Sequence, residues 1–470
     1  MKAKQIVSIC LAVTILALSV FLPGLSPARL TPGGLTPAGL TPEGVRTIGM
    51  LLAFLIMLIS EALPMMLTCL VFLVLMPLLK VTQSFPEALT GFSNPVVFFI
   101  LASFGIAAAI TEVPLSKRLL GALLRLFGKN VKSIVFALMS CTALVSSVVS
   151  NVPTCAIFMA VSLSFLELYE DETEKKKTGR TLMIAIPVAS MIGGMMTPAG
   201  SSVNLLAISL LEQNTGKTIS FVQWMTAGIP LNIILIPLAW FLVCAINKPS
   251  EIKAGTLNAF ISKLDIPARI SIPEIKTLII TGIMLVLWIL SSWFRGINIM
   301  VVALAGCCVF CLPGIRVLEF KTFLSHISWQ SFFLVGTVLA LGAAMVNNDV
   351  SGWLISIIPA PQLPVPLLIG FIVSVTFALL IFIPVSVSLL TFMALPFITM
   401  GAGAPPEIIM LSFGLCVANC YLLPLDTVPL LTYSTGYYSM TDLAKTTLPL
   451  QLCIIVIMSL WIPFAGKLFF

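Results

Sequence analysis

Long runs of apolar residues fill almost the whole of this 470-residue chain, and its charged residues are confined to short segments between them. Hydrophobic residues make up 59% of the chain and charged residues only 9%, whereas soluble proteins contain about 25% charged residues. An α-helix needs ~20 predominantly apolar residues to cross the hydrocarbon core of a bilayer. We therefore predict an all-α polytopic membrane protein, which excludes a soluble fold.

The net charge of +7 comes from 25 Lys and Arg against 18 Asp and Glu. These charges are clustered between apolar runs and form no continuous basic face, so nucleic acid is not expected as a partner. The eleven cysteines all lie in apolar segments and indicate no disulfide framework. The chain has one His, no H-E-x-x-H and no G-x-S-x-G motif, so we expect no enzyme.

Charges, Pro and Gly breaks and Trp positions predict about eleven transmembrane helices. Their approximate ranges are 6–22, 47–60, 63–79, 95–112, 181–212, 223–246, 277–294, 297–313, 328–346, 405–436 and 447–466. Residues 1–46 are predicted to be a first helix and an exposed linker, in which 30–44 repeat the pattern LTPxG three times. A cleavable signal peptide also fits residues 1–28, but the absence of a clean cleavage site favours a retained helix.

Two further segments, 133–166 and 366–400, are predicted to be re-entrant hairpins. The first is interrupted at Ser146-Ser147 and at Ser150 to Thr154, and the second at Pro384 to Ser388. These interruptions leave arms of about 14 residues, shorter than the ~20 needed to span. With both hairpins entering and leaving on one side, 19 of the 25 Lys and Arg lie on the side of the N-terminus. The positive-inside rule then places the N-terminus and the first hairpin in the cytoplasm and the second hairpin outside.

An internal repeat relates the two halves of the chain. Residues 96–160 and 330–394 are similar at a constant offset, and the predicted hairpin breaks fall at equivalent positions. We therefore predict a first repeat at 47–246, a cytoplasmic linker at 247–276, and a second repeat with the last helix at 277–470. Because the charge distribution places the halves on opposite sides, the repeats are inverted, which is typical of alternating-access transporters.

Each repeat also contains a helix interrupted by Pro and Gly, 181–212 at Pro198 to Ser202 and 405–436 at Pro424 to Pro429. Backbone groups without helical hydrogen bonds are tolerated at membrane depth only where protein or a water-filled cavity satisfies them. Each hairpin tip and its broken helix are expected to meet near the midplane. There they would present carbonyl and hydroxyl oxygens to a cation, and helix N-termini to an anion.

From about residue 45 onward the sequence resembles the divalent anion:sodium symporter family, which carries di- and tricarboxylates and sulfate. The stretches that carry this resemblance are SEALP at 60–64, GFSNPVV at 91–97, Ser146 with Ser150-Asn151, GGMMTPAG at 193–200 and LPLDT at 423–427. The resemblance implies inverted five-helix repeats, a homodimer formed through a scaffold domain, and an elevator-type movement. It also implies a Ser-Asn-Thr motif at each hairpin tip that holds sodium and the anion together.

The resemblance assigns the first sodium site to Ser146, Ser150, Asn151 and Gly200. The motif's Thr is replaced by Val152, which has no hydroxyl, so Thr154 or Ser201 would have to contact the substrate instead. The expected substrate-binding residues, in both repeats, are Asn151, Thr154, Ser201, Ser386 and Thr427.

The second site departs further from the family, because Pro384-Val385-Ser386 stands where Ser-Asn-Thr is expected. We assign a second sodium or proton site to Val385, Ser386 and Asp426. Asp426 is the one acid predicted near the midplane, where an ionisable side chain costs at least ~2.5 kcal/mol. Three roles remain open for it: a sodium ligand, a proton carrier, or the N-cap of the helix that begins near Pro429.

These observations predict a sodium-coupled symporter of a small divalent anion, most simply a dicarboxylate such as succinate, malate or fumarate, in the plasma (inner) membrane. Na⁺ is the expected coupling ion, H⁺ is possible at the second site, and no organic cofactor is expected. The alternatives are a dicarboxylate exchanger or a proton-coupled anion transporter on the same fold, with sulfate or citrate as the substrate. The identity of the anion and the number of coupled cations are not determined by the sequence.

Overall fold

The computed structural model describes most of the chain, and all regular secondary structure in the described residues is helical. The described residues are 3–25, 40–60, 62–127, 130–251, 256–264, 266–267, 269–294, 296–350, 353, 363–383, 385–401, 403–419 and 421–469. Most of the LTPxG repeats, Glu61 of the family motif and Pro384 lie outside them. The prediction of an all-α polytopic membrane protein is confirmed.

Seven helices are long and apolar enough to cross a membrane, or eight if the bent pair α5 (Pro95–Thr111) and α6 (Leu115–Phe127) counts as one span; this count covers the described residues. The seven are α2 (Pro42–Ser60), α7 (Val131–Val149), α11 (Phe221–Asn247), α13 (Ile272–Leu290), α16 (Trp329–Asn347), α18 (Val365–Phe382) and α22 (Met440–Phe469). Large apolar side chains on α11, α13 and α22 face outward, among them Ile233, Leu278 and Leu460. Such a surface suits contact with lipid.

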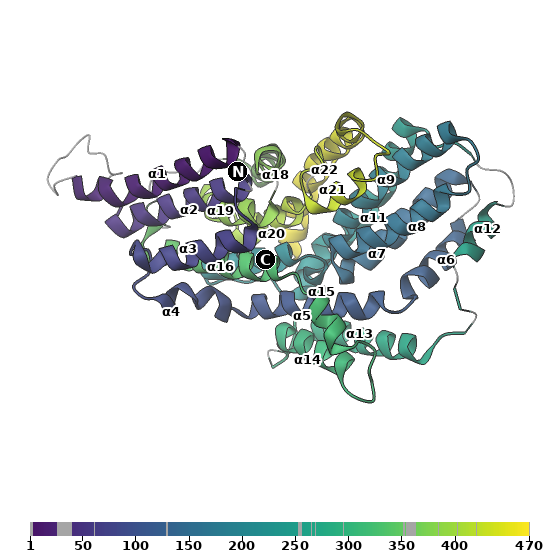
Figure 1. The fold of residues 1–470 in the computed structure, drawn as a ribbon, viewed down its shortest axis with the longest axis horizontal. Helices are drawn as coiled ribbons and strands as arrows, with labels where there is room; N and C mark the ends of the chain where they lie inside the picture. Colours follow the sequence, from purple (N-terminus) through teal and green to yellow (C-terminus); the bar gives the residue numbers. More distant parts are fainter. Residues whose placement is uncertain are drawn as a thin grey trace.

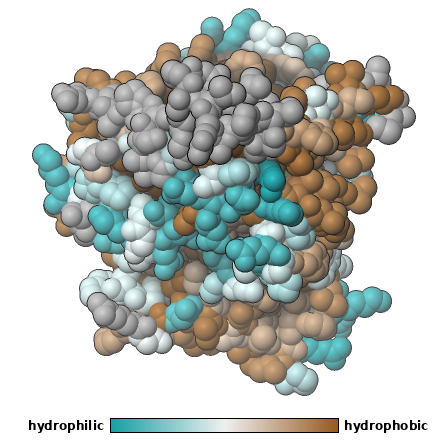
Figure 2. Space-filling view, turned by 90° about the vertical axis from the view of Figure 1, so that its left-hand side faces the viewer, coloured by the Kyte–Doolittle hydropathy of each residue, from teal (hydrophilic) through white to brown (hydrophobic). Residues whose placement is uncertain are grey.

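The first helices lie together at one end of the molecule (Figure 1). α1 (Ala3–Leu25) packs against α2, and α3 (Met65–Leu78) packs against α2 and α16. The short helices α4 (Phe85–Ala88) and η1 (Thr90–Ser93) follow at the same end. Figure 2 shows this end of the molecule, where hydrophilic residues gather in the middle and hydrophobic residues cover the right-hand flank.

Two short helices, at 256–263 and 320–326, were not predicted from the sequence, whereas the helix at 299–311 lies within the predicted range 297–313. α12 (Thr256–Lys263) lies in the predicted linker 247–276, at the opposite end of the molecule from α1 (Figure 1). α14 (Ile299–Cys311) packs against α5 and α13, and α15 (Phe320–His326) also contacts α5. α2 and α13 each begin five residues before their predicted starts at 47 and 277, so the domain boundaries at 46 and 276 fall inside helices.

The hairpin arms are longer than predicted. α7 has 19 residues and α8 (Asn151–Leu166) has 16, while α18 has 18 and α19 (Ser386–Met400) has 15. The prediction of about 14-residue arms was wrong because Ser146-Ser147 does not interrupt α7: the Ser147 hydroxyl donates to the carbonyl of Leu144 at 2.7 Å, inside the helix. The chain breaks at Ser150 and just before Ser386, inside the predicted interruptions, but residues 151–154 and 386–388 are already helical. Re-entry from one side of a membrane stays a prediction.

The two interrupted helices also differ in detail from their predicted ranges. The first is α9 (Glu172–Gly194), η2 (Pro198–Gly200) and α10 (Ser202–Thr215), and α9 begins nine residues before the predicted start at 181. The second is α20 (Pro406–Val417) and α21 (Thr427–Tyr433). Its break spans 418–426 and not Pro424 to Pro429, because Pro429 is accommodated in the first turn of α21, where no backbone N–H is needed.

The helices around both breaks pack in the same pattern in the two repeats. α9 packs against both α7 and α8, and α20 packs against both α18 and α19. The helix after each break crosses to the other repeat, so that α10 contacts α19 and α20 while α21 contacts α8 and α9. Each repeat thus sends one helix into contact with the other repeat. These contacts bring the two tips and the two breaks into one central region.

A buried ion pair fastens the predicted linker to α6. Arg118 of α6 pairs with the fully buried carboxylate of Glu274 in α13, and also donates to the carbonyl of Arg269 at 2.5 Å. Glu274 accepts a further hydrogen bond from the backbone N–H of Ser271 at 2.7 Å. Arg118 and Ser271 thus both bind the Glu274 carboxylate, which caps the N-terminus of α13.

Replacing Glu274 by Gln should lower the melting temperature of the detergent-purified protein by several degrees, because it leaves the Arg118 charge without its partner. Differential scanning fluorimetry measures this shift. The matched control is Glu167→Gln, which removes an ion pair to Lys263 whose two side chains are largely exposed. That change should have little effect, and equal shifts for the two variants would contradict a stabilising role for the buried pair.

Candidate functional site

The tip of the first hairpin is a single residue in a strained conformation. Ser150 joins α7 to α8 with φ 80° and ψ 155°, a positive φ that L-residues rarely adopt. Non-glycine residues are held in such conformations only by the surrounding structure, and they cluster at functional sites. Asn151 is the first residue of α8, and its side chain lies against Ser146 of α7 and Gly194 of α9.

A buried network of hydroxyl and amide groups surrounds Asn151. The Ser146 Oγ lies 2.9 Å from Asn151 Oδ1, 2.8 Å from the carbonyl oxygen of Ser190 and 3.2 Å from Ser190 Oγ. The Ser190 hydroxyl donates to the carbonyl of Asn151 at 2.8 Å. The Ser146 hydroxyl has one proton but lies near three acceptor oxygens. The network therefore has more acceptor oxygens than hydroxyl protons to bond them.

Two glycines allow the helix break to approach this network. A Cβ on Gly194 would collide with the Asn151 side chain, and a Cβ on Gly200 would lie 2.6 Å from the carbonyl oxygen of Gly194. The predicted first-site residues Ser146, Asn151 and Gly200 are therefore brought together through Gly194. Ser150 adjoins them as the neighbour of Asn151.

Side chains in the break and in α10 bind carbonyl oxygens around the break. Thr197 donates to the carbonyl of Ser147 at 2.6 Å and accepts from the N–H of Gly200 at 3.1 Å. The Asn204 amide donates to the carbonyls of Gly194 at 2.8 Å and Thr197 at 2.9 Å. Ser190 and Asn204 were missed by the sequence analysis, although a polar residue inside an apolar segment is itself a signal.

The hydroxyls predicted to replace that of the missing Thr are both buried. Thr154 is fully buried and its Oγ1 has no hydrogen-bond partner in the part of the chain that the structure describes, whereas Ser201 accepts from the N–H of Val203 at 3.3 Å as the N-cap of α10. Ser388, 234 residues after Thr154, is likewise buried with an unpartnered hydroxyl. Each repeat thus keeps one buried hydroxyl free at the equivalent position of its hairpin, and buried polar groups are rarely left unpaired.

The second hairpin tip and the second break meet at Asp426. The Ser386 hydroxyl donates to one carboxylate oxygen of Asp426 at 3.3 Å, and the Thr427 hydroxyl donates to the other at 2.9 Å. Val385 is the N-cap of α19 and lies beside Ser386. Asp426 occupies the N-cap position of α21, and its carboxylate lies beside the backbone N–H groups of Thr427 and Val428, so a capping role stays open alongside cation or proton binding.

The two half-sites are in contact. The thiol of Cys155, next to Thr154, lies 3.6 Å from the carbonyl oxygen of Val428, next to Thr427. On the other side, α10, which begins after Ser201, packs against α19, which begins at Ser386. The predicted substrate-binding residues of the two repeats therefore lie in one central region.

The chemistry of this region is that of hard oxygen ligands. Hydroxyl, amide and carbonyl oxygens and one carboxylate are present, and Lys and Arg are absent from both tips and both breaks. Within the described part of the chain, no three His, Cys, Asp or Glu side chains gather as a transition-metal site requires. The arrangement suits a small monovalent cation, with an anion held by the cation and by helix N-termini.

Comparison with known proteins identifies relatives over most of the chain. The sequence model of a family described as citrate transporter (CitMHS) matches residues 55–462. A sodium-dependent dicarboxylate transporter of Staphylococcus saprophyticus is 25% identical over 434 residues, which cover 86% of this chain and 83% of the relative. An uncharacterized transporter of Haemophilus influenzae is 28% identical, over 87% of this chain and 89% of the relative.

A solved structure shares the fold. The MtrF structure of Neisseria gonorrhoeae, described as illuminating a class of antimetabolite efflux pumps, superposes with a TM-score of 0.63 over 98% of this chain and 94% of that one. Sequence identity is 10%, so the likeness concerns the fold alone.

Proposed function

Because this chain belongs to the citrate transporter family, we propose that it is a sodium-coupled symporter that imports a small divalent anion, most simply a dicarboxylate such as succinate, malate or fumarate. Membership makes it an integral membrane transporter and not an enzyme, and it agrees with the resemblance drawn from the sequence motifs. The observation that carries the proposal is the pair of oxygen clusters at the hairpin tips, one buried around Asn151 and one half-buried around Asp426. The sodium-dependent dicarboxylate transporters among the relatives support both the ion and the substrate class.

Sodium ions are assigned to the two clusters. Ser146, Ser150, Asn151 and Gly200 hold the first ion, and Val385, Ser386 and Asp426 hold the second. The unsaturated acceptor oxygens around Asn151 support the first assignment, and the carboxylate of Asp426 supports the second. H⁺ remains the alternative at the second site, since a half-buried carboxylate is also suited to carry a proton.

The anion is held between the clusters by helix N-termini and hydroxyls. α8 begins at Asn151, α10 at Ser202, α19 at Ser386 and α21 at Thr427, so four helix N-termini start in the central region. The N-terminus of a helix carries free N–H groups and a positive dipole end that attract anions. The hydroxyls of Thr154 and Ser201 from one repeat, and of Ser386 and Thr427 from the other, complete the contacts together with the Asn151 amide.

The membrane potential sets the coupling requirement. Moving a dianion inward against an inside-negative potential of 100 mV costs about 4.6 kcal/mol, at ~2.3 kcal/mol per charge. Two cations neutralise the substrate and a third makes the cycle driven by the potential. An ionised Asp426 would repel the dianion, so the cation must bind before the substrate.

We also propose that the protein acts as a homodimer in the plasma (inner) membrane with its N-terminus in the cytoplasm. Its hairpin-bearing part would move as an elevator between the two sides. The 19 Lys and Arg on the N-terminal side support the orientation, and the family resemblance supports the dimer and the movement.

The test is uptake of labelled succinate into proteoliposomes under an inward sodium gradient, an inward proton gradient, or neither. We expect rapid accumulation with sodium alone, and competition by malate and fumarate. Accumulation with protons alone would reassign the second site to H⁺. Exchange against internal dicarboxylate without net uptake would overturn symport, and competition by citrate or sulfate alone would change the substrate.

A further inference from the structure

A cavity of about 260 Å³ lies at the charged ends of α9 and α22, away from the central region. Its lining comes from the first turns of α9, the segment before α22 and the first turn of α22: Thr173, Lys176, Lys177, Arg180, Tyr437 and Asp442. Ser190 lies ten residues beyond Arg180 on α9, which is about 15 Å along a helix. The cavity is therefore separate from the proposed sodium and substrate sites.

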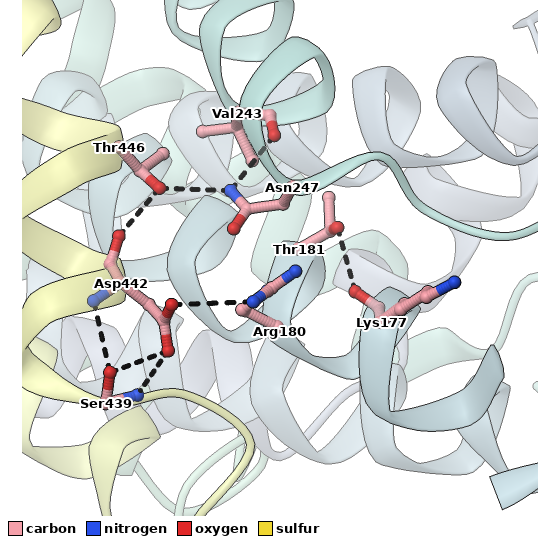
Figure 3. Close-up of polar contacts among 8 residues, drawn as sticks. All are labelled: Lys177, Arg180, Thr181, Val243, Asn247, Ser439, Asp442 and Thr446. Carbon is pink, nitrogen blue, oxygen red and sulfur yellow. Dashed lines mark hydrogen bonds and ion pairs between the residues drawn. The ribbon is translucent and has the colours of Figure 1, made fainter. Parts of the chain in front are cut away.

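The acid in this cavity is already committed to capping α22. Asp442 accepts from the backbone N–H of Ser439 at 3.0 Å and from its hydroxyl at 2.7 Å, while the N–H of Asp442 donates to Ser439 Oγ at 3.2 Å. The remaining carboxylate oxygen lies 3.4 Å from Arg180 Nη1 (Figure 3). The cavity lining thus holds three cationic side chains, and its one carboxylate is already engaged by Ser439 and Arg180.

The cations retain unused donors. Among the described residues, the Nε of Arg180 is buried without a hydrogen-bond partner. In the described part of the chain, no acid pairs with the ammonium groups of Lys176 or Lys177, and Figure 3 shows the Lys177 ammonium directed away from Asp442. A buried guanidinium N–H without an acceptor is costly, and an oxyanion is its natural partner.

One wall of the cavity is fixed by tight packing. The ring of Tyr437 lies directly on the backbone of α9 at Gly179, where a Cβ would collide with it. The segment between α21 and α22 thus packs against α9, and Tyr437 forms one wall of the cavity beside Lys176 and Arg180.

We propose that this cavity binds the oxyanion group of an anionic ligand, a phosphate carried by a phospholipid headgroup or free in solution, through Lys176, Lys177 and Arg180. A basic pocket between membrane helices on the cytoplasmic side suits an anionic headgroup, and the charge distribution predicts that this end is cytoplasmic. The bound group would tie α9 to the segment that connects α21 to α22. It would thereby link the helix that carries Ser190 and Gly194 to the helix that begins beside Asp426.

The experiment compares the wild-type chain with Lys176→Ala/Lys177→Ala, and with the matched control Lys117→Ala/Lys321→Ala. The control removes the same charge from exposed lysines predicted on the same side but outside the cavity. One arm titrates the detergent-purified proteins with inorganic phosphate and follows the melting temperature. The other arm counts retained lipids by native mass spectrometry, after reconstitution in nanodiscs of phosphatidylglycerol and phosphatidylcholine.

We expect selective retention of phosphatidylglycerol by the wild type and the control, and roughly 30-fold weaker retention by the double variant, from two lysines near an anionic headgroup. Arg180→Gln should also weaken retention, since it removes the buried Nε–H. Binding of inorganic phosphate that the double variant loses, without lipid selectivity, would support the site with a soluble ligand. Retention and phosphate binding that are equal in all variants would overturn it.

Discussion

Asp426→Asn should raise the sodium concentration needed for half-maximal succinate uptake at least tenfold. The carboxylate accepts hydrogen bonds from Ser386 and Thr427 on different oxygens. Asn keeps one acceptor oxygen, and its NH2 group can donate to the other hydroxyl, so the change removes the charge at nearly constant shape. A unit charge pair at contact distance is worth about 4 kcal/mol at an effective dielectric constant of 20. Uptake into proteoliposomes at a series of external sodium concentrations measures the effect.

The control for this variant is Glu407→Gln, at the start of α20, whose carboxylate pairs with the half-exposed Lys217. It removes the same charge from the same repeat and should leave the sodium dependence unchanged. If Asp426 instead carries a proton, Asp426→Asn should abolish proton-driven accumulation while exchange of internal for external succinate continues. Unchanged sodium and proton dependence in the variant would remove Asp426 from the coupling mechanism.

Gly194→Ala should reduce sodium-driven uptake at least tenfold by disturbing the first site. The added methyl group would occupy the position of the Asn151 side chain, which must then move away from Ser146. A loss of one ligand worth about 1.4 kcal/mol already corresponds to a tenfold weaker affinity. The measurement is initial uptake rate as a function of sodium concentration, with protein levels matched by size-exclusion chromatography.

Gly282→Ala is the matched control, because it makes the same substitution in a membrane helix where no atom of the described residues lies within 4 Å of the new Cβ. Alanine is also the better helix former, so this variant should fold and transport like the wild type. A Gly194→Ala protein that transports as well as Gly282→Ala would show that the contact between Gly194 and Asn151 has no part in ion binding.

Much of the candidate site was predictable because it depends on local exceptions to helix chemistry. The breaks at Ser150 and at Pro198 to Ser202 were visible as polar, Pro and Gly residues inside apolar runs, and the one acid at Asp426 stood out for the same reason. Ser190 and Asn204 were not predicted. Their importance comes from the hydrogen bonds that they make in the folded protein. Ser190 donates to the carbonyl of Asn151, and Asn204 donates to carbonyls at the α9 break.

Helix lengths were less predictable for a related reason. Ser146-Ser147 reads as a break in the sequence, but the Ser147 hydroxyl bonds a carbonyl of its own helix, so α7 continues to Val149. Pro429 reads as part of a break, yet it is accommodated in the first turn of α21. Serine and proline are compatible with both outcomes, and the surrounding packing decides between them.

By itself the sequence determined the membrane environment and the all-helical class, and it predicted the two repeats and the residues of the two tips, because hydrophobicity and helix interruption act locally along the chain. Only the tertiary structure decided that α10 and α21 cross between the repeats, that Ser386 meets Asp426, and that Lys176 and Arg180 line a cavity with Tyr437. These contacts join residues far apart in the chain. They depend on which apolar helix faces pack against each other. A uniformly apolar sequence does not show which faces these are.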